Sequence, residues 1–420
     1  MTDLKTRRDQ AFGSGSTLFY RDPVHIVRGD GVYLEDADGR RYIDMYNNVP
    51  SVGHCHPHVV EAVSRQLGTL NVHSRYLHEA IVEYAERLTA KHHAGIESVV
   101  FSCTGTEANE VALMMARAAT GGQGIICTNA AYHGNSTEVR RLTRCDSSRG
   151  DVRAVPFPDS YRAAELNGDP LSIHLEALQK TIEGFKKDGV PFAGMLVCPI
   201  FANEGLPTML PGYLAQAQTL VHDAGGLFIC DEVQAGLCRT GNWWGYESAG
   251  FEPDIVTMGK PIGAGIPLAA TAASADLLAA FRNSTRYFNT FASTPAQAAA
   301  GNAVLDVIEQ EQVLRNVQET GAWLLQALQN LQAERAHPRL GDIRAQGLFY
   351  ALEWVEPEST RPDRDGAIEI VHALKDRGFL VSNAGAFGNV VKLRPPLVYG
   401  RVHAEAFMSA FRDVLTVARA

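Results

Sequence analysis

The sequence predicts an α/β protein with a large domain built on a mostly parallel sheet and a smaller α+β domain at its C-terminal end. Two observations predict the large domain. Strand-like and helical segments alternate from about residue 98 onward, and the strand-like segments are continuous apolar runs. Such runs are typical of strands that helices cover on both faces. The third observation is PRLGDIRAQGLFYALEWV near the C-terminus, which has the character of antiparallel strands.

The expected elements follow this plan in chain order. GVYLEDADGRRYIDMYNN predicts a hairpin, and HPHVVEAVSRQLGTL predicts a helix with Pro57 in its first turn. Strands are expected at SVVFSC, GIICTN, AGMLVCPI, LFICDEV and DIVTM, and helices at TEANEVALMMARAAT and YLAQAQTLVHDAGG. A long helical stretch over 296–334 follows. We expect residues 1–55 to join the small domain, residues 56–325 to form the large domain, and residues 326–420 to form the small domain.

Composition limits the class of protein. The chain of 420 residues is 45% hydrophobic and 20% charged, as in soluble globular proteins, and its net charge of -9 argues against a general nucleic-acid binder. Its longest apolar stretch contains Pro199 and is too short to span a membrane. Seven cysteines without a CxxC pair, and an N-terminus without an apolar signal segment, predict a cytoplasmic protein.

Chemically marked residues follow three of the expected strands. Asp231 and Glu232 come after LFIC, Lys260 comes after DIVTM, and CTGTEANE comes after SVVFS and opens a helix. In open α/β sheets, ligands bind outside the carboxyl ends of the strands. We therefore expect these residues to share one site.

Each of these residues has a plain structural interpretation beside the functional one. Gly105 and Thr106 could bind a phosphate at a helix N-terminus, or belong to an ordinary N-cap. Asp231 could face a cationic ring nitrogen or cap a turn, and Lys260 could be a Schiff-base lysine or a surface residue.

One cofactor, pyridoxal phosphate (PLP), accounts for all three features together. Lys260 would form the imine, Asp231 would keep the pyridine nitrogen protonated, and the helix N-terminus would hold the phosphate. Tyr132 and His133, in AAYHGNST, could supply an aromatic ring that stacks on the cofactor, or could simply pack in a loop.

The sequence resembles the class III aminotransferases, which are PLP enzymes of fold type I with a seven-stranded sheet. The resemblance rests on FSCTGTEANEVALMMARAATG, NAAYHG, LFICDEVQAGLCRTG, PDIVTMGKPIGAGIPLAA and FNTFASTP, and covers about residues 20 to 415. It implies a small-molecule amine substrate, and it implies cofactor roles for Gly105, Thr106, Tyr132, Asp231, Val233, Gln234 and Lys260. Thr290 matches a threonine that reaches the neighbouring subunit's cofactor phosphate, which implies a homodimer or homotetramer.

A closer resemblance concerns the reaction. DPVHIVRGDGVYLEDADGRRYIDMYNNVPSVGHCHP, LNVHSRYLHEAIVEYAERLTA and FPDSYR are similar to the phospho-lyases of O-phosphoethanolamine and phosphohydroxylysine. In VVKLRPPL, Lys392 stands where many class III enzymes place an arginine that binds the substrate α-carboxylate, with Arg394 beside the prolines. Lysine offers a point charge instead of a planar fork. A class III transaminase remains the alternative, in which Arg394 or another arginine binds the carboxylate.

A phospho-lyase needs a second anion site, for the substrate phosphate. Arg75, Arg21 and Arg282 are candidates by charge and position, although exposed arginines are usually only solvated. The sequence also departs from relatives, with FASTP in place of a GGNP-like segment and Cys238 in place of a glycine. Glu204 either lies near the ring or caps a turn.

Three other classes of protein fit the sequence less well. The two histidines of HCHP are too few for a metal site, and a turn before a helix explains them better. GAGIP does not supply the GxGxxG of a nicotinamide enzyme. A non-catalytic binding protein would not need Lys260.

Overall fold

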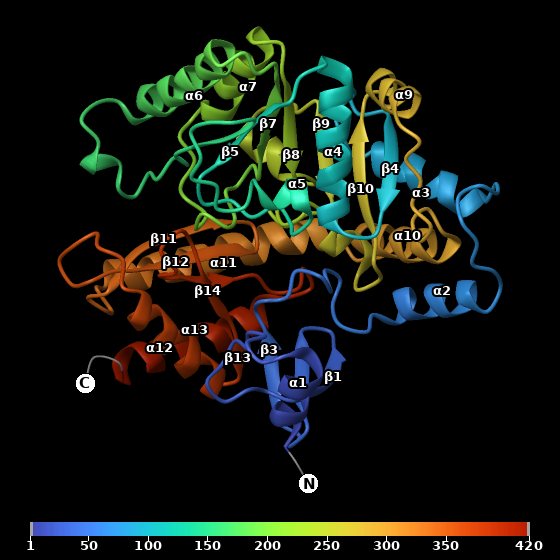
Figure 1. Cartoon of the computed structure of the whole chain (residues 1–420). Coiled ribbons are helices and arrows are strands. Elements are labelled where there is room, and N and C mark those ends of the chain that lie inside the picture. Colours follow the sequence, from blue (N-terminus) through green and yellow to red (C-terminus); the bar gives the residue numbers. More distant parts are fainter. Residues whose placement is uncertain (1–2, 418–420) are drawn as a thin grey trace.

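A seven-stranded sheet forms the centre of the larger part of the molecule (Figure 1) in this computed structural model, which describes residues 3–417. The strand order is β4-β10-β9-β8-β7-β5-β6, and β10 alone runs antiparallel to its neighbours. The mostly parallel sheet is therefore confirmed. The strands are β4 (Ser98–Ser102), β5 (Gly124–Thr128), β6 (Val152–Val155), β7 (Phe192–Val197), β8 (Leu227–Asp231), β9 (Ile255–Met258) and β10 (Ala269–Ala273).

Helices cover both faces of this sheet, as the continuous apolar strands predict. In β8, Phe228 and Cys230 belong to the main hydrophobic core, whereas Ile229 between them belongs to a second core on the opposite face. The main core contains residues of α6 (Pro170–Lys187), α7 (Tyr213–Asp223) and α10 (Pro295–Gln310). The second core contains residues of α4 (Gly105–Thr120), α5 (Thr137–Arg140) and α9 (Ala275–Ser284).

The two ends of the chain meet in the smaller part of the molecule (Figure 1). β1 (Ile26–Asp30), β2 (Tyr33–Asp36) and β3 (Arg41–Asp44) form a meander that includes the expected hairpin, and β3 pairs with β13 (Phe379–Leu380). An antiparallel sheet has the order β11-β12-β15-β14. Its strands are β11 (Leu340–Gln346), β12 (Phe349–Trp354), β14 (Ser382–Ala384) and β15 (Val390–Leu393).

The expected helical stretch over 296–334 is two helices, α10 and α11 (Val313–Ala333), because Gln312 between them has a left-handed φ of 52°. The expected domain boundary at residue 325 falls inside α11. The other helices are α1 (Leu4–Phe12), α2 (Pro57–Leu67), α3 (Glu79–Thr89), α8 (Gly245–Ala249), α12 (Arg364–Asp376) and α13 (Arg401–Val417), with short 3-10 turns at Ala163–Glu165 and Lys260–Gly263. Among residues 3–417, no helix is both long and apolar enough to cross a membrane.

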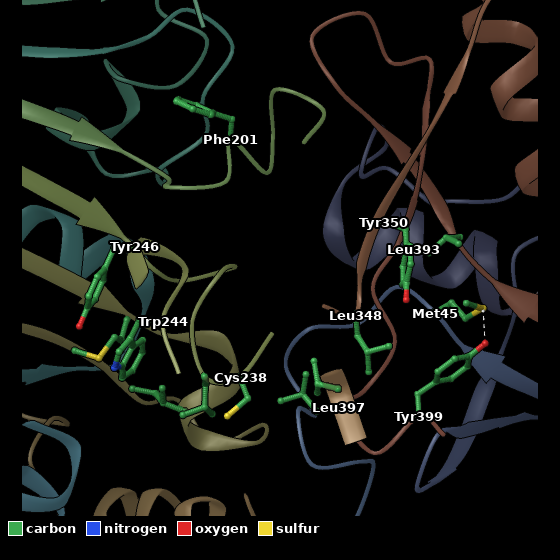
Figure 2. Packing of buried hydrophobic residues seen from close by; sticks show 14 of the residues in the cluster. Met45, Phe201, Cys238, Trp244, Tyr246, Leu348, Tyr350, Leu393, Leu397 and Tyr399 are labelled. Carbon is green, nitrogen blue, oxygen red and sulfur yellow. Dashed lines mark hydrogen bonds between the residues drawn. The ribbon is translucent and has the colours of Figure 1, made fainter. Parts of the chain in front are cut away.

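One hydrophobic core joins the two parts. Figure 2 shows Trp244 and Tyr246 from the larger part, and Tyr350 and Tyr399 from the smaller part, all members of the main core. Trp244 stacks on the His92 ring at a centroid distance of 4.1 Å and donates a hydrogen bond to the Lys91 carbonyl. This shared core fixes the small antiparallel sheet against the large one, beside the site described below.

Close packing between β7 and β8 leads to a first prediction. A Cβ added at Gly194 would lie 2.1 Å from the Leu227 carbonyl oxygen, and this backbone atom cannot move without breaking the strand pair. Gly194→Ala should lower the free energy of unfolding by about 3 kcal/mol, as overpacking of a tight core does. Chemical denaturation would measure this.

Gly68→Ala is the matched control, because Gly68 has a φ of −74° and its Cβ would make only ordinary contacts at 3.5 Å. Equal stability of the two variants would contradict the predicted clash.

Candidate active site

A cavity of about 330 Å³ opens at the carboxyl ends of β4, β5, β8 and β9. The parallel strands bring these ends to one edge of the sheet, so residues far apart in sequence meet there. Of the predicted cofactor residues, Thr290 does not border the cavity. Those that line it are Gly105, Thr106, Tyr132, His133, Asp231, Val233, Gln234 and Lys260.

The N-terminus of α4 presents free backbone N–H groups to this cavity. A capping box fixes the first turn: the Thr104 hydroxyl accepts from the Glu107 N–H, and the Glu107 carboxylate accepts from the N–H of Thr104. In the described chain, no acceptor meets the N–H groups of Gly105 or Thr106. A Cβ at Gly105 would lie 2.9 Å from a Val233 methyl group, which explains the glycine. An anion fits here, since the helix dipole adds to the free donors.

Asp231 is a buried carboxylate at the end of β8 with three protein donors. Its Oδ2 accepts from His133 Nδ1 at 2.7 Å and from Asn109 Nδ2 at 3.0 Å, and its Oδ1 accepts from the Val233 N–H at 3.0 Å. Burial alone would raise the pKa of Asp231, but the hydrogen bond and charge of His133 and the charge of Lys260 hold that pKa below its ordinary value. The ionised carboxylate therefore suits a cationic ring nitrogen.

Lys260 follows β9 after one intervening residue, Gly259, and begins a 3-10 turn with a left-handed φ of 35°. Gly259 packs so closely on Gly105 that a Cβ would lie 3.3 Å from the Gly105 Cα. Burial, followed by the charge of Arg394, lowers the pKa of the Lys260 amine to about 8. More of the amine is therefore unprotonated near neutral pH than in an ordinary lysine, and the neutral amine can form an imine.

Two asparagines were missing from the sequence-based site. Asn109, one helical turn after Gly105, holds Asp231 and is itself fixed by the Thr257 hydroxyl. Asn203 lines the cavity, accepts from Gln234 Nε2 at 3.0 Å and donates to the Tyr132 carbonyl at 3.1 Å. The i, i+4 spacing from Gly105 was a signal for Asn109; no comparable signal marked Asn203.

The predicted substrate arginines lie away from the cavity of their own chain. The exposed side chain of Arg21 forms an ion pair with Glu369, and Arg75 lies over the Phe288 ring at 4.2 Å. Arg282 donates a weak hydrogen bond to the Tyr287 carbonyl at 3.4 Å. Thr290 lies with Phe288 in a separate hollow beside Glu107.

Lys392 on β15 and Arg394 just after it are both buried, and neither lines the cavity. Arg394 is bound to protein groups: it donates to the Tyr46 carbonyl and to the Gln234 side chain. Lys392 forms no ion pair with any described residue, and its ammonium lies 5.5 Å from the centroid of the Phe349 ring. Burial, followed by the charges of Arg394 and Lys260, lowers the pKa of Lys392 to about 7.

Glu204 is buried beside the cavity and accepts hydrogen bonds from the Thr128 hydroxyl and the Asn203 N–H. Burial raises the pKa of Glu204.

The two histidines of HCHP have separate partners. His54 Nε2 lies 2.7 Å from Asp44 Oδ2, and His56 Nε2 lies 3.1 Å from Glu311 Oε1. Among the described residues, no group of three side chains is arranged to hold a metal ion.

The family of class III aminotransferases matches residues 19–415. The chain belongs to this family. An Arthrobacter phospholyase, solved in complex with phosphoethanolamine, is similar with a TM-score of 0.93 and 38% identity over 99% of both chains. An Arabidopsis thaliana mitochondrial alanine–glyoxylate aminotransferase 2 homologue is 36% identical over 97% of this chain and 86% of its own length. A Caenorhabditis elegans ethanolamine-phosphate phospho-lyase homologue is 33% identical over 99% of this chain and 93% of its own length.

Class III aminotransferases use PLP, and this chain is a PLP-dependent enzyme of that family with the fold-type-I architecture. The cavity fits the cofactor: free N–H groups can hold its phosphate, Asp231 can face its ring nitrogen, and Lys260 can meet its aldehyde. We propose these roles for the single residues.

The lowered pKa of Lys260 leads to a second prediction, on the apoenzyme. Imine formation needs the neutral amine, which predominates above the pKa, so the rate of PLP recapture should rise with pH through about 8. Stopped-flow absorbance would follow this rate.

Lys180, whose side chain is exposed on the surface, provides a control through its reaction with an amine-labelling reagent. A recapture midpoint above pH 10 would show that Lys260 is not held in a desolvated pocket.

Proposed function

We propose that this enzyme is a phospho-lyase that eliminates phosphate from O-phosphoethanolamine or a similar phosphorylated primary amine, giving an aldehyde and ammonia. The observation that carries the proposal is Lys392, a buried cation without a carboxylate partner among the described residues, close to Lys260. The Arthrobacter phospholyase with bound phosphoethanolamine and the C. elegans phospho-lyase homologue support the same reaction.

Burial of the Lys392 ammonium destabilises the fold unless a bound anion compensates for its positive charge. A buried charge without a partner loses its hydration and gains no compensating ion pair. Arg394 and Lys260 add further positive charge at this place, and Arg394 is already committed to Tyr46 and Gln234. A substrate phosphate would supply the missing negative charge, and a single lysine suits a phosphate oxygen without the planar fork that a carboxylate prefers.

Lys260 and Asp231 have separate roles in the elimination. The amine of Lys260 takes the proton from the substrate carbon that bears nitrogen, for which its lowered pKa is suited. Asp231 holds a positive charge at the position of the ring nitrogen, so that PLP, when bound, can accept the electron pair left on that carbon. With phosphate on the next carbon, that electron pair forms the carbon–carbon double bond as the carbon–oxygen bond to phosphate breaks, and water hydrolyses the released enamine to the aldehyde and ammonia.

A transaminase is the second candidate, favoured by the Arabidopsis relative at 36% identity. It would use the same Lys260 and Asp231, and would return the proton at the cofactor instead of expelling phosphate. Arg394 would then have to leave Gln234 to bind a substrate carboxylate. A non-catalytic role has least support, because the lysine and its desolvated pocket are both retained.

A second copy of this chain would complete the site. Thr290 lies outside its own cavity, in a surface hollow with the strongly exposed side chain of Phe291. Arg75 is stacked on Phe288 in the same segment. We propose that this surface meets a second copy, which places Thr290 at the neighbour's phosphate site and leaves Arg75 as a candidate for the substrate anion.

Phosphate release tests the proposed reaction directly. Purified enzyme with PLP, O-phosphoethanolamine and no keto acid should release inorganic phosphate and acetaldehyde in equal amounts. Lys260→Ala should abolish this release and the imine absorbance. Amino transfer to pyruvate without phosphate release would establish the transaminase instead.

Lys392→Ala tests the substrate-anion role. Loss of a charge-assisted contact worth about 1.5–3 kcal/mol should raise the KM for O-phosphoethanolamine by about 10- to 150-fold. In the wild type the cation is present below a pKa of about 7 and is lost above it, so KM should rise as the pH passes upward through 7. That rise should vanish in Lys392→Ala.

Lys180→Ala, at an exposed position, is the matched control and should leave KM unchanged. A wild-type KM in Lys392→Ala would remove Lys392 from the substrate site.

A further inference from the structure

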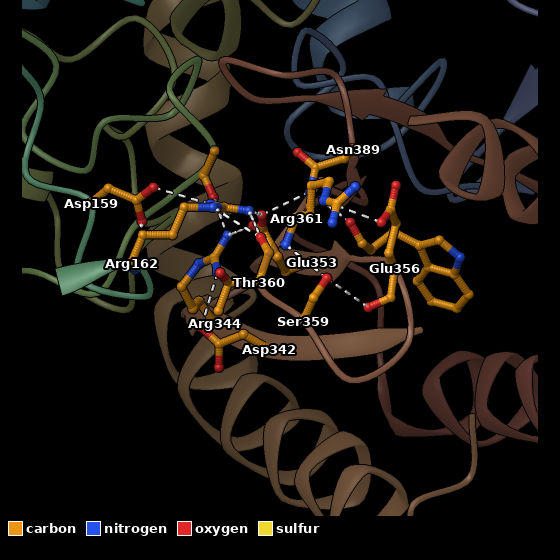
Figure 3. A network of polar contacts seen from close by, with 12 residues as sticks. Asp159, Arg162, Asp342, Arg344, Glu353, Glu356, Ser359, Thr360, Arg361 and Asn389 are labelled. Atoms are coloured by element: carbon orange, nitrogen blue, oxygen red, sulfur yellow. Dashed lines mark hydrogen bonds and ion pairs between the residues drawn. The ribbon is translucent and has the colours of Figure 1, made fainter. Parts of the chain in front are cut away.

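A buried polar network lies where the small antiparallel sheet meets the larger part of the molecule (Figure 3). Its centre is Glu353 on β12, whose Oε2 accepts from Arg344 at 2.6 Å and whose Oε1 accepts from Arg162 at 2.7 Å. Asn389 donates to Glu353 as well, at 2.8 Å. Arg162 belongs to the segment after β6, so the network joins elements that are far apart in the sequence.

Arg344 uses its guanidinium to hold a loop of the larger part. Its Nε donates to the Leu206 carbonyl at 2.8 Å, and one Nη donates to the Gly205 carbonyl at 2.9 Å. Its other Nη forms an ion pair with Asp342 at 2.9 Å. The side chain is buried, and its planar set of donors therefore fixes both carbonyls and two carboxylates at once.

The loop that Arg344 holds borders the active-site cavity. Asn203 lines the cavity and contacts Gln234 and the Tyr132 carbonyl. The backbone of this turn is strained, because Leu206 has a left-handed φ of 52°. Such a conformation persists only where surrounding contacts hold the backbone in it. The hydrogen bond from Arg344 to the Leu206 carbonyl is such a contact.

The same face of the small sheet carries Lys392. Arg344 pairs with Ala351 across β11 and β12, and Ala351 pairs with Lys392 across β12 and β15. Residues directly opposite each other on neighbouring strands share one face of a sheet. One rigid face therefore bears Arg344 on one strand and Lys392 two strands away.

We propose that Arg344, held by Glu353, is a positioning residue of the active site: it fixes the loop of residues 203–206, and with it Asn203, relative to Gln234. Arg344 touches neither the cavity nor the reacting atoms. The inference does not depend on which reaction the enzyme catalyses, since it concerns residues that lie around the cofactor site in either case.

The test uses two conservative variants of the full-length enzyme. Arg344→Lys keeps the charge but loses the planar donors, and Glu353→Gln keeps the size but removes the charge that orients Arg344. Arg339→Lys is the matched control, because Arg339 forms an ion pair with Asp363 at 2.6 Å in the same sheet region, is half exposed and has no contact with the loop.

Three measurements are made on each variant: amide hydrogen exchange over residues 201–206, the affinity of the apoenzyme for PLP, and kcat/KM for O-phosphoethanolamine. If that substrate releases no phosphate, kcat/KM is measured for an amine donor with pyruvate, so failure of the lyase proposal leaves this test intact. Thermal unfolding verifies that each variant is folded at the assay temperature.

We expect faster exchange over residues 201–206 in both variants, weaker PLP binding, and a kcat/KM lowered by about 100-fold, the size expected for a misplacement on the order of 1 Å. Arg339→Lys should match the wild type in all three. Wild-type exchange and kcat/KM in both variants would overturn the inference, and so would an equal loss in Arg339→Lys, which would indicate only a weakened small domain. If Arg344→Lys does not fold, Glu353→Gln decides by the same criteria.

Discussion

The burial of an ionised carboxylate at Asp231 is the constraint on which the rest of the site depends. A charge in the interior of a protein must be paired or it is neutralised. His133, Asn109 and the Val233 N–H supply that pairing, from the loop after β5, from helix α4 and from the chain just after β8. The hydrogen bonds that keep Asp231 charged therefore also fix the elements that form the cavity.

Positive charge is the second organising feature of the site. Lys392 and Arg394 are buried and Lys260 is half-buried, and desolvation, followed by the charge of Arg394, lowers the pKa values of both lysines. Arg394 is satisfied by backbone and amide oxygens, and Arg239 is held in the same way by the Leu348 and Pro395 carbonyls. Within residues 3–417, neither lysine forms a hydrogen bond or an ion pair of this kind. The protein thus concentrates positive charge where we propose that an anionic cofactor and an anionic substrate bind.

Two departures from the family pattern have a conformational cost. Cys238 has a φ of 68°, and Ser293, within FASTP, has a φ of 55°. Side chains are disfavoured in this left-handed region, where glycine, the residue that the resemblance leads us to expect, would not be strained. Cys238 is fully buried in the main core, so packing compensates for the strain in this chain.

The sequence by itself determined the mostly parallel sheet, the convergence of strand ends and most of the predicted cofactor residues that line the cavity. Those follow from local patterns, since apolar runs specify buried strands and Thr104 with Glu107 specifies a helix N-terminus. Only the tertiary structure decided that Asn203 borders the cavity, that Arg394 is bound to Gln234, and that Arg344 shares a sheet face with Lys392. These contacts depend on how the two parts of the molecule pack together, which no local pattern encodes.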